Sequence, residues 1–238
     1  MTHLFIHGTA SSGRIWRRLL EAMESPEGVL TPDIPGMGDA RLPQGTSLSF
    51  EDWLHYFRAL VSGRRVHLVG HSLGGAIAVH LAKEPWVSSV TLLAPATRAY
   101  CEARRAASMS GRNPDSLVFE SPLRGLAASP GHISREDAGV LREDYAKAAP
   151  LLAAGVPWPP YPASEAEYLS GKPVLLVYGE EDAVIPPCYF RRLGDELAEA
   201  GICVTVVPLP GCGHIPQLED AHGLARVLKS FWERSGGG

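Results

Sequence analysis

The chain has 238 residues, of which 45% are hydrophobic and 20% charged, with 25 glycines and 20 prolines. That length suits one large domain or two small ones, and an apolar fraction near one half excludes a disordered or acidic-tail protein. The 22 basic and 26 acidic side chains give a formal net charge of −4, which does not favour binding to nucleic acid or to an anionic membrane surface.

Short strand-like runs alternate along the chain with longer stretches of helical periodicity. The runs are apolar on both faces and end at Gly, Pro or Asp, as in a parallel sheet that is covered on both sides. In chain order they are His3–His7, Gly28–Thr31, Val66–Val69, Ser89–Leu93, Val174–Tyr178 and Ile202–Val207. The helical stretches between them are Arg14–Met23, Ser49–Ser62, Gly74–Lys83, Tyr189–Ala200 and Ala221–Trp232. This alternation predicts an α/β fold with a mostly parallel, doubly wound sheet of about six strands.

One segment interrupts the alternation. From Thr97 to Tyr168 no run has the pattern of a strand, although Cys101–Met109 and Arg135–Leu152 have helical periodicity. A structureless loop of that length is uncommon inside a compact domain. We therefore predict a core domain of residues 1–96 and 169–238, with residues 97–168 forming a helical cap.

The strongest local motif is G-x-S-x-G, written here as Gly70-His71-Ser72-Leu73-Gly74. It follows an apolar strand and opens an alanine-rich helix, which is the setting of a nucleophile elbow. In such an elbow the serine hydroxyl of Ser72 stands clear at the carboxyl edge of the sheet, beside a helix N-terminus. The alternative is a glycine-rich strand–helix turn whose serine has no chemical role.

A serine hydroxyl becomes a good nucleophile only when a base takes its proton. Among nine histidines, His214 follows the last predicted strand and precedes the last helix, so it is expected at the same sheet edge as Ser72. Asp182 follows the strand PVLLVYG at that edge and is the candidate acid, whereas Glu180 and Glu181 are interpreted as solvated turn residues. The order Ser, Asp, His is the one expected for a catalytic triad on this kind of sheet.

An acyl-transfer site also needs donors for the oxyanion that forms at the carbonyl. The backbone N–H of Leu73 directly follows the nucleophile and is the first expected donor. The second is expected in the segment IHGTASSG, from the amide of Thr9 or, as the weaker alternative, Ala10. The hydroxyls of Ser11 and Ser12 fit a substrate contact and a helix N-cap equally well.

The remaining patterns predict no cofactor, metal or membrane segment. The four cysteines show no C-x-x-C spacing, and no ligand cluster has metal spacing. No apolar run approaches the length of a membrane helix, and the N-terminus lacks the features of a signal peptide, so we expect a cytoplasmic protein.

With these motifs in place, the chain resembles the α/β-hydrolase superfamily over nearly its whole length. The resemblance rests on FIHGTASSGRIW, DIPGMGDA, LVGHSLGGAIAVHLA, LLAPA, PVLLVYGEEDAVIP and PGCGHIPQLED. It implies a helical cap where the alternation breaks, Ser72 as nucleophile, His214 as base, Asp182 as acid, and Thr9 and Leu73 as oxyanion donors. It also argues against haloalkane dehalogenases and epoxide hydrolases, which are similar elsewhere but carry aspartate at the nucleophile position.

The predicted function is a serine hydrolase that cleaves a carboxylic ester or thioester of a small to medium apolar substrate. Two alternatives remain: a carbon–carbon bond hydrolase or lyase that uses the triad for proton transfer, and a small-molecule binder without catalysis. The substrate is expected to meet the cap, and the candidate binding residues are Trp158, Tyr161, Met109 and Phe119, with Leu151 and Leu152. These residues fit a pocket lining and the cap's own core equally well. The sequence makes no prediction of the oligomeric state.

Overall fold

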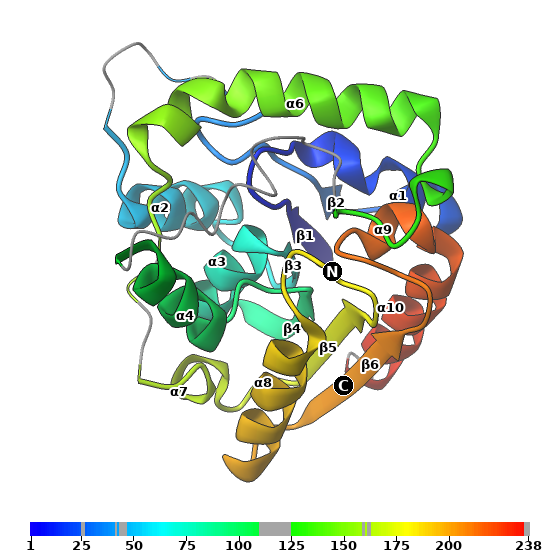
Figure 1. The fold of residues 1–238 in the computed structure, drawn as a ribbon. Helices are drawn as coiled ribbons and strands as arrows, with labels where there is room; N and C mark the ends of the chain where they lie inside the picture. The colour runs from blue at the N-terminus through cyan, green and yellow to red at the C-terminus, as the bar shows by residue number, and fades with distance from the viewer. Residues whose placement is uncertain are drawn as a thin grey trace.

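The fold is organised around one six-stranded, all-parallel sheet (Figure 1). The computed structural model describes residues 1–24, 27–40, 42, 47–109, 125–158, 160 and 163–235. The strand order is β2-β1-β3-β4-β5-β6. The chain therefore starts next to one edge of the sheet, forms that edge with β2, and then adds β3 to β6 in sequence towards the other edge. The strands are β1 (Thr2–Ile6), β2 (Val29–Leu30), β3 (Val66–His71), β4 (Val87–Leu93), β5 (Val174–Gly179) and β6 (Val204–Leu209).

Helices cover both faces of this sheet, which confirms the doubly wound α/β fold. One face packs against α2 (Phe50–Leu60), α3 (Leu73–Leu81) and α8 (Pro187–Glu199). The other packs against the 3₁₀ helix η1 (Gly13–Trp16), α1 (Arg17–Ala22), α9 (Pro216–Glu219) and α10 (Ala221–Ser235). Alternate residues of a strand point to opposite faces, so Leu4 and Ile6 join the first cluster while Phe5 joins the second.

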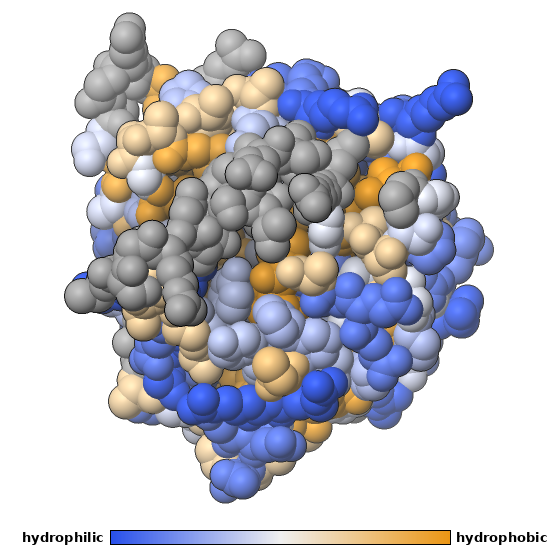
Figure 2. All heavy atoms as spheres, in the orientation of Figure 1, coloured by the Kyte–Doolittle hydropathy of each residue, from blue (hydrophilic) through white to orange (hydrophobic). Residues whose placement is uncertain are grey.

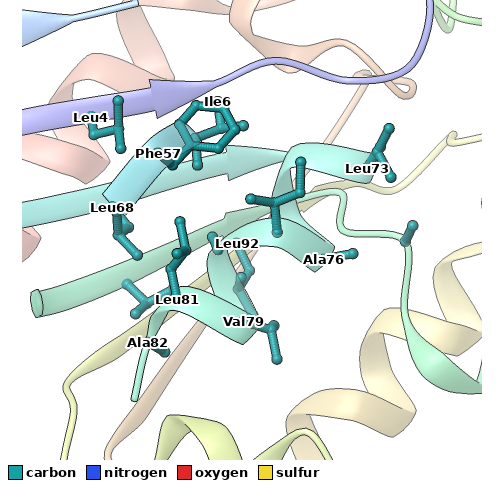
Figure 3. Packing of buried hydrophobic residues seen from close by; sticks show 14 of the residues in the cluster. Leu4, Ile6, Phe57, Leu68, Leu73, Ala76, Val79, Leu81, Ala82 and Leu92 are labelled. Atoms are coloured by element: carbon teal, nitrogen blue, oxygen red, sulfur yellow. The ribbon is translucent and has the colours of Figure 1, made fainter. Parts of the chain in front are cut away.

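The core around the central strands is fully closed to solvent. Figure 3 shows side chains of α3 lying against those of β1, β3 and β4, among them Val79, Leu68 and Leu92. Helix α3 is buried on all sides, which is why its sequence LGGAIAVHL lacks a polar face. This burial fixes the start of α3, and hence the turn that leads into it, against the sheet.

The observed elements differ from the sequence prediction mainly at one edge. The prediction that the strands are covered on both sides is wrong for β6, which is an edge strand with Val206 39% exposed. An apolar run does not reveal the position of its strand in the sheet, because β-branched residues suit an edge as well as a centre. The first predicted helix also divides into η1 and α1, since Ser12 caps a tight 3₁₀ turn before the α-helix begins.

The described part of the segment between β4 and β5 consists of helices joined by turns and loops, without a strand. It contains α4 (Arg98–Met109), the 3₁₀ helix η2 (Pro130–His132), α6 (Arg135–Ala154) and α7 (Ala166–Leu169). Helix α6 runs across the top of the view in Figure 1, above β1 and beside α1. Figure 2 shows hydrophilic side chains where α6 begins, at the upper right, and more apolar ones where it ends, at the upper left.

Buried histidines make the stability of this fold depend on pH. His67 on β3 accepts or donates a hydrogen bond at 2.6 Å to the Ser89 hydroxyl and stacks on His3, and burial lowers the pKa of His67 to about 4. Between pH 6.5 and 4 the unfolded chain therefore binds a proton at His67 that the folded chain does not, so acidification through this window favours unfolding. We expect the free energy of unfolding, measured by urea titration, to be lower at pH 5.0 than at pH 7.5.

A substitution isolates the contribution of His67 to that change. The variant His67→Asn should show a smaller loss of stability between the two pH values, whereas His55→Asn, on the exposed surface of α2, should keep the full loss. Equal losses in His67→Asn and the unmodified protein would show that another group is responsible.

Candidate active site

Ser72 lies in a strained turn between β3 and α3. Its φ and ψ are 52° and −115°, a region that L-residues rarely adopt, and it precedes the first residue of α3. A Cβ atom added to Gly70 would lie 2.2 Å from the Gly74 carbonyl oxygen, and one added to Gly74 would lie 2.2 Å from the Ile6 carbonyl oxygen. Both glycines are therefore required by close backbone approach, which is the reason that the motif predicts an elbow.

His214 and Asp182 form a buried pair beside this turn. His214 lies in the loop between β6 and α9, and its Nδ1 is 2.7 Å from Asp182 Oδ2, with both residues less than 5% exposed. Asp182 Oδ1 accepts hydrogen bonds from the backbone N–H groups of Val184 and Ile185, each at 2.8 Å. These bonds hold the carboxylate in place and leave Oδ2 to accept a hydrogen bond from the Nδ1–H of His214.

The pairing sets the tautomer of His214. A carboxylate can only accept a hydrogen bond, so Nδ1 of the neutral imidazole carries the proton and Nε2 has a free lone pair. The neighbouring carboxylates that could have been mistaken for the acid, Glu180 and Glu181, are both exposed to solvent. The structure therefore brings Asp182, and neither of these neighbours, to His214.

A second histidine supports the loop that carries His214. His71 donates a hydrogen bond from Nε2 to the His214 carbonyl oxygen at 2.8 Å, since a carbonyl only accepts. Burial, followed by the nearby His214, lowers the pKa of His71 well below its usual range. His71 therefore stays neutral and acts as a fixed donor, a role that the sequence motif alone did not indicate.

The loop after β1 approaches the same turn. A Cβ atom added to Gly8 would lie 2.9 Å from His71 Nδ1 and 3.1 Å from Ser72 Cβ, so glycine allows Thr9 to come close to the elbow. His7 fixes this loop, because its Nδ1 donates to the Gly8 carbonyl oxygen at 2.8 Å and its Nε2 accepts from the Ile34 N–H at 2.9 Å.

One cavity of about 320 Å³ joins these segments. Ser72 and His214 both line it, as do Thr9 and Ser11, and within the described residues the buried Ser11 hydroxyl has no hydrogen-bond partner. Most of the other lining residues are aliphatic: Ala10, Ile15, Ala96, Leu126, Leu141, Leu152, Val156, Val184, Ile185 and Ile215. Leu73 and Asp182 do not line the cavity; Leu73 is the next residue after Ser72, and Asp182 is hydrogen-bonded to His214.

The predicted substrate-binding residues are only partly placed by the structure. Trp158 and Leu152 line the cavity, whereas Leu151 packs in the core. Tyr161 and Phe119 lie outside the described residues, as does the side chain of Met109, although its backbone ends α4.

Sequence reasoning missed three polar lining residues on the helices that cover the cavity. Tyr100 and Arg104 lie one turn apart on α4, and Tyr145 lies on α6. The i, i+4 spacing of Tyr100 and Arg104 was a signal that they share a face, but not that this face meets the cavity. Burial is the main effect that raises the pKa of Tyr100, so its hydroxyl stays protonated and able to donate a hydrogen bond.

The described part of the chain contains neither a metal-binding cluster nor a membrane-spanning helix. No group of three or more His, Cys, Asp or Glu side chains is arranged there to hold a metal ion. Within the same residues, no helix has the length and apolar character needed to cross a membrane.

The chain is similar to known proteins in sequence and in fold. The epoxide hydrolase EphH of Mycobacterium tuberculosis is 29% identical over 185 residues, which cover 70% of this chain and 86% of that protein. The lipase LipV of the same organism is 38% identical over 99 residues, which cover 39% of this chain and 36% of the lipase. A thermophilic esterase from Thermogutta terrifontis shares the fold, with a TM-score of 0.72 and 18% identity over 99% of this chain and 90% of that one. The model of the alpha/beta hydrolase family matches residues 4–227, and the chain therefore belongs to this family.

Proposed function

We propose that the protein is a serine hydrolase that cleaves a carboxylic ester or thioester of small to medium size through an acyl-enzyme. The observation that carries this proposal is the arrangement around the cavity: Ser72 in a strained elbow and His214, held by Asp182 at 2.7 Å, line the same space. A strained nucleophile beside an oriented base is the arrangement that acyl transfer needs.

The proposed reaction has two halves. In the first, Ser72 Oγ attacks the substrate carbonyl carbon while His214 Nε2 takes the hydroxyl proton, and the N–H groups of Leu73 and Thr9 stabilise the oxyanion. The tetrahedral intermediate collapses, the bond to the leaving group breaks, and His214 returns the proton to the departing alcohol or thiol. In the second half, His214 removes a proton from water, whose oxygen attacks the acyl carbon. The second tetrahedral intermediate then collapses, the bond to Ser72 Oγ breaks, and His214 returns the proton to Ser72 as the acid is released.

Ser72 at the elbow favours cleavage of an ester over hydrolysis of an epoxide, the activity in the name of EphH. Attack of a serine hydroxyl on an epoxide carbon would give a dialkyl ether, which has no carbonyl for water to attack. A carboxylate nucleophile would instead give an ester that water can hydrolyse. Ser72 therefore suits acyl substrates, whose intermediate with serine is an ester.

The walls of the cavity support a small to medium apolar substrate. A volume of about 320 Å³ is at the lower end of the range for small-molecule sites. The aliphatic lining suits an acyl or alkyl chain, and Tyr100, Tyr145 and Trp158 add polar atoms at the side formed by residues 97–168. We propose that this segment serves as the cap that selects the substrate.

A panel of p-nitrophenyl esters tests this proposal. We expect kcat/KM to be highest for acyl chains between acetate and hexanoate and to fall at least about tenfold for laurate, because the longer chain exceeds the cavity. Filling the lining with Leu152→Trp should shift the preference to shorter chains. Absence of turnover with every ester, together with cleavage of a diketone, would contradict the proposal in favour of a carbon–carbon hydrolase.

A further inference from the structure

Helix α6 carries two carboxylates on its buried face. Its buried residues are Asp137, Leu141, Asp144, Ala148 and Leu151, which follow the spacing of one helical stripe. Asp144 is completely buried and Asp137 is 5% exposed. Burial of a carboxylate costs much free energy unless the group is paired and hydrogen-bonded. The partners of these two side chains therefore show which parts of the fold hold α6 in place.

Asp144 pairs with the end of the loop that follows β1. Ser12 Oγ donates a hydrogen bond to Asp144 Oδ2 at 2.5 Å, and the Arg14 guanidinium donates to Asp144 Oδ1. The Ser12 hydroxyl in turn accepts from the backbone N–H and from Nε of Arg14, each at 3.3 Å. Burial alone would lower the pKa of Arg14, but its hydrogen bonds to Asp144 and Glu143 raise it, so the guanidinium stays charged.

Ser12 is one of two anchors of the segment that contains Thr9. The other anchor is His7, which holds the segment on its β1 side through Gly8 and Ile34. Between the anchors, Ala10 has a φ of 55°, which is uncommon for a residue other than glycine, asparagine or aspartate and requires external support. Part of that support comes from α6, 132 residues further along the chain.

The same turn of α6 also covers the cavity. Leu141 and Tyr145, which flank Asp144 on the helix, both line the cavity. Asp144 therefore links the part of α6 that lines the cavity to the Thr9 loop, which lines the same cavity.

We propose that Asp144 is a positioning residue that couples the docking of α6 over the cavity to the geometry of the oxyanion loop Thr9–Ser12. The inference rests on the proposed ester hydrolysis. When α6 is docked, Asp144 holds Ser12, and Ser12 keeps the Thr9 amide where the oxyanion forms. When this contact is lost, the substrate still enters the cavity but the tetrahedral intermediate is less well stabilised.

Asp137 provides a matched control on the same helix. Its carboxylate pairs with Arg18 Nε at 2.7 Å and with the Arg17 guanidinium at 3.2 Å, both on α1, and Ser134 Oγ donates to it at 2.6 Å. None of these described partners belongs to the Thr9–Ser12 loop. Ser134 is the N-cap of α6, so loss of the Asp137 carboxylate weakens both this cap and the docking of α6 on α1, and it should destabilise the docked helix.

The test compares Asp144→Asn, Ser12→Ala and Asp137→Asn by thermal midpoint, ester kinetics and inhibition by phenylboronic acid, which forms a tetrahedral adduct with a nucleophilic serine. We expect Asp144→Asn and Ser12→Ala each to lower kcat at least tenfold with less than a threefold change in KM, and to weaken inhibition by a similar factor. Combining the two should add little, since they break one contact. Asp137→Asn should lose a comparable amount of thermal stability but keep kcat within about twofold.

The outcomes separate this inference from the proposed function. Wild-type kcat in Asp144→Asn and Ser12→Ala, or an equal fall of kcat in Asp137→Asn, would overturn the coupling. If Asp144→Asn does not fold, Ser12→Ala removes the same contact from the loop side and keeps the pairing of the Asp144 carboxylate with Arg14. Ester hydrolysis that persists after loss of Ser72 would instead overturn the proposed function.

Discussion

Replacing Ser72 by alanine should abolish ester hydrolysis while leaving the fold intact. The substitution removes only Oγ, so the cavity, the pair of His214 with Asp182 and the backbone donors remain, but no acyl-enzyme can form. Losses of kcat on the order of 10⁴-fold or more are typical when the nucleophile of a triad is removed. The Ser72 side chain does not cap α3, and alanine carries the same Cβ in the strained turn, so the thermal midpoint should change little.

Ser62→Ala is a suitable control, because Ser62 is exposed in the turn after α2, outside the cavity lining. It should match the unmodified protein in kcat, KM and thermal midpoint. Retention of more than a tenth of the wild-type kcat by Ser72→Ala would mean that another group attacks the substrate.

Replacing Asp182 by asparagine should be nearly as damaging, through the tautomer of His214. The side-chain oxygen of asparagine would keep the hydrogen bonds from Val184 and Ile185, which places its NH₂ group opposite His214 Nδ1. Two donors cannot face each other, so the imidazole proton moves to Nε2 and the base loses the lone pair that receives the Ser72 proton. We expect kcat at pH 7 to fall about 10³- to 10⁴-fold, with KM changed much less.

Glu181→Gln makes the same chemical change one residue earlier in the turn. Glu181 is exposed, so this variant should keep the wild-type kcat. If instead Glu181→Gln reduces kcat as much as Asp182→Asn, orientation of His214 by Asp182 is not the cause of the loss.

The fold could be predicted from the sequence because its strongest constraints are local. Apolar runs that end in turn residues mark the strands, and helix-period stretches between them imply parallel crossovers. What the pattern could not supply was the exposure of β6, since the position of a strand in the sheet depends on pairing between distant segments.

In the candidate site, too, local patterns could be predicted from the sequence, whereas contacts between distant segments could not. Ser72, Asp182 and His214 could be proposed because each lies in the segment that follows a strand of one parallel sheet, and the carboxyl ends of such strands meet at one edge. Asp144 could not be proposed, because its contact with Ser12 depends on how α6 docks across the sheet. The spacing of a buried carboxylate along α6 predicts that the side chain faces inwards, but not which loop it meets.

Covalent labelling with a fluorophosphonate tests the central claim most directly. Attack by an activated serine on phosphorus releases fluoride and leaves a stable adduct, which peptide mass spectrometry assigns to one residue. The proposed function predicts a single adduct on the peptide containing Ser72, complete loss of esterase activity when labelling is complete, and no adduct in Ser72→Ala. An unlabelled Ser72 in protein that hydrolyses esters, or an adduct on another residue that accounts for the loss of activity, would contradict it.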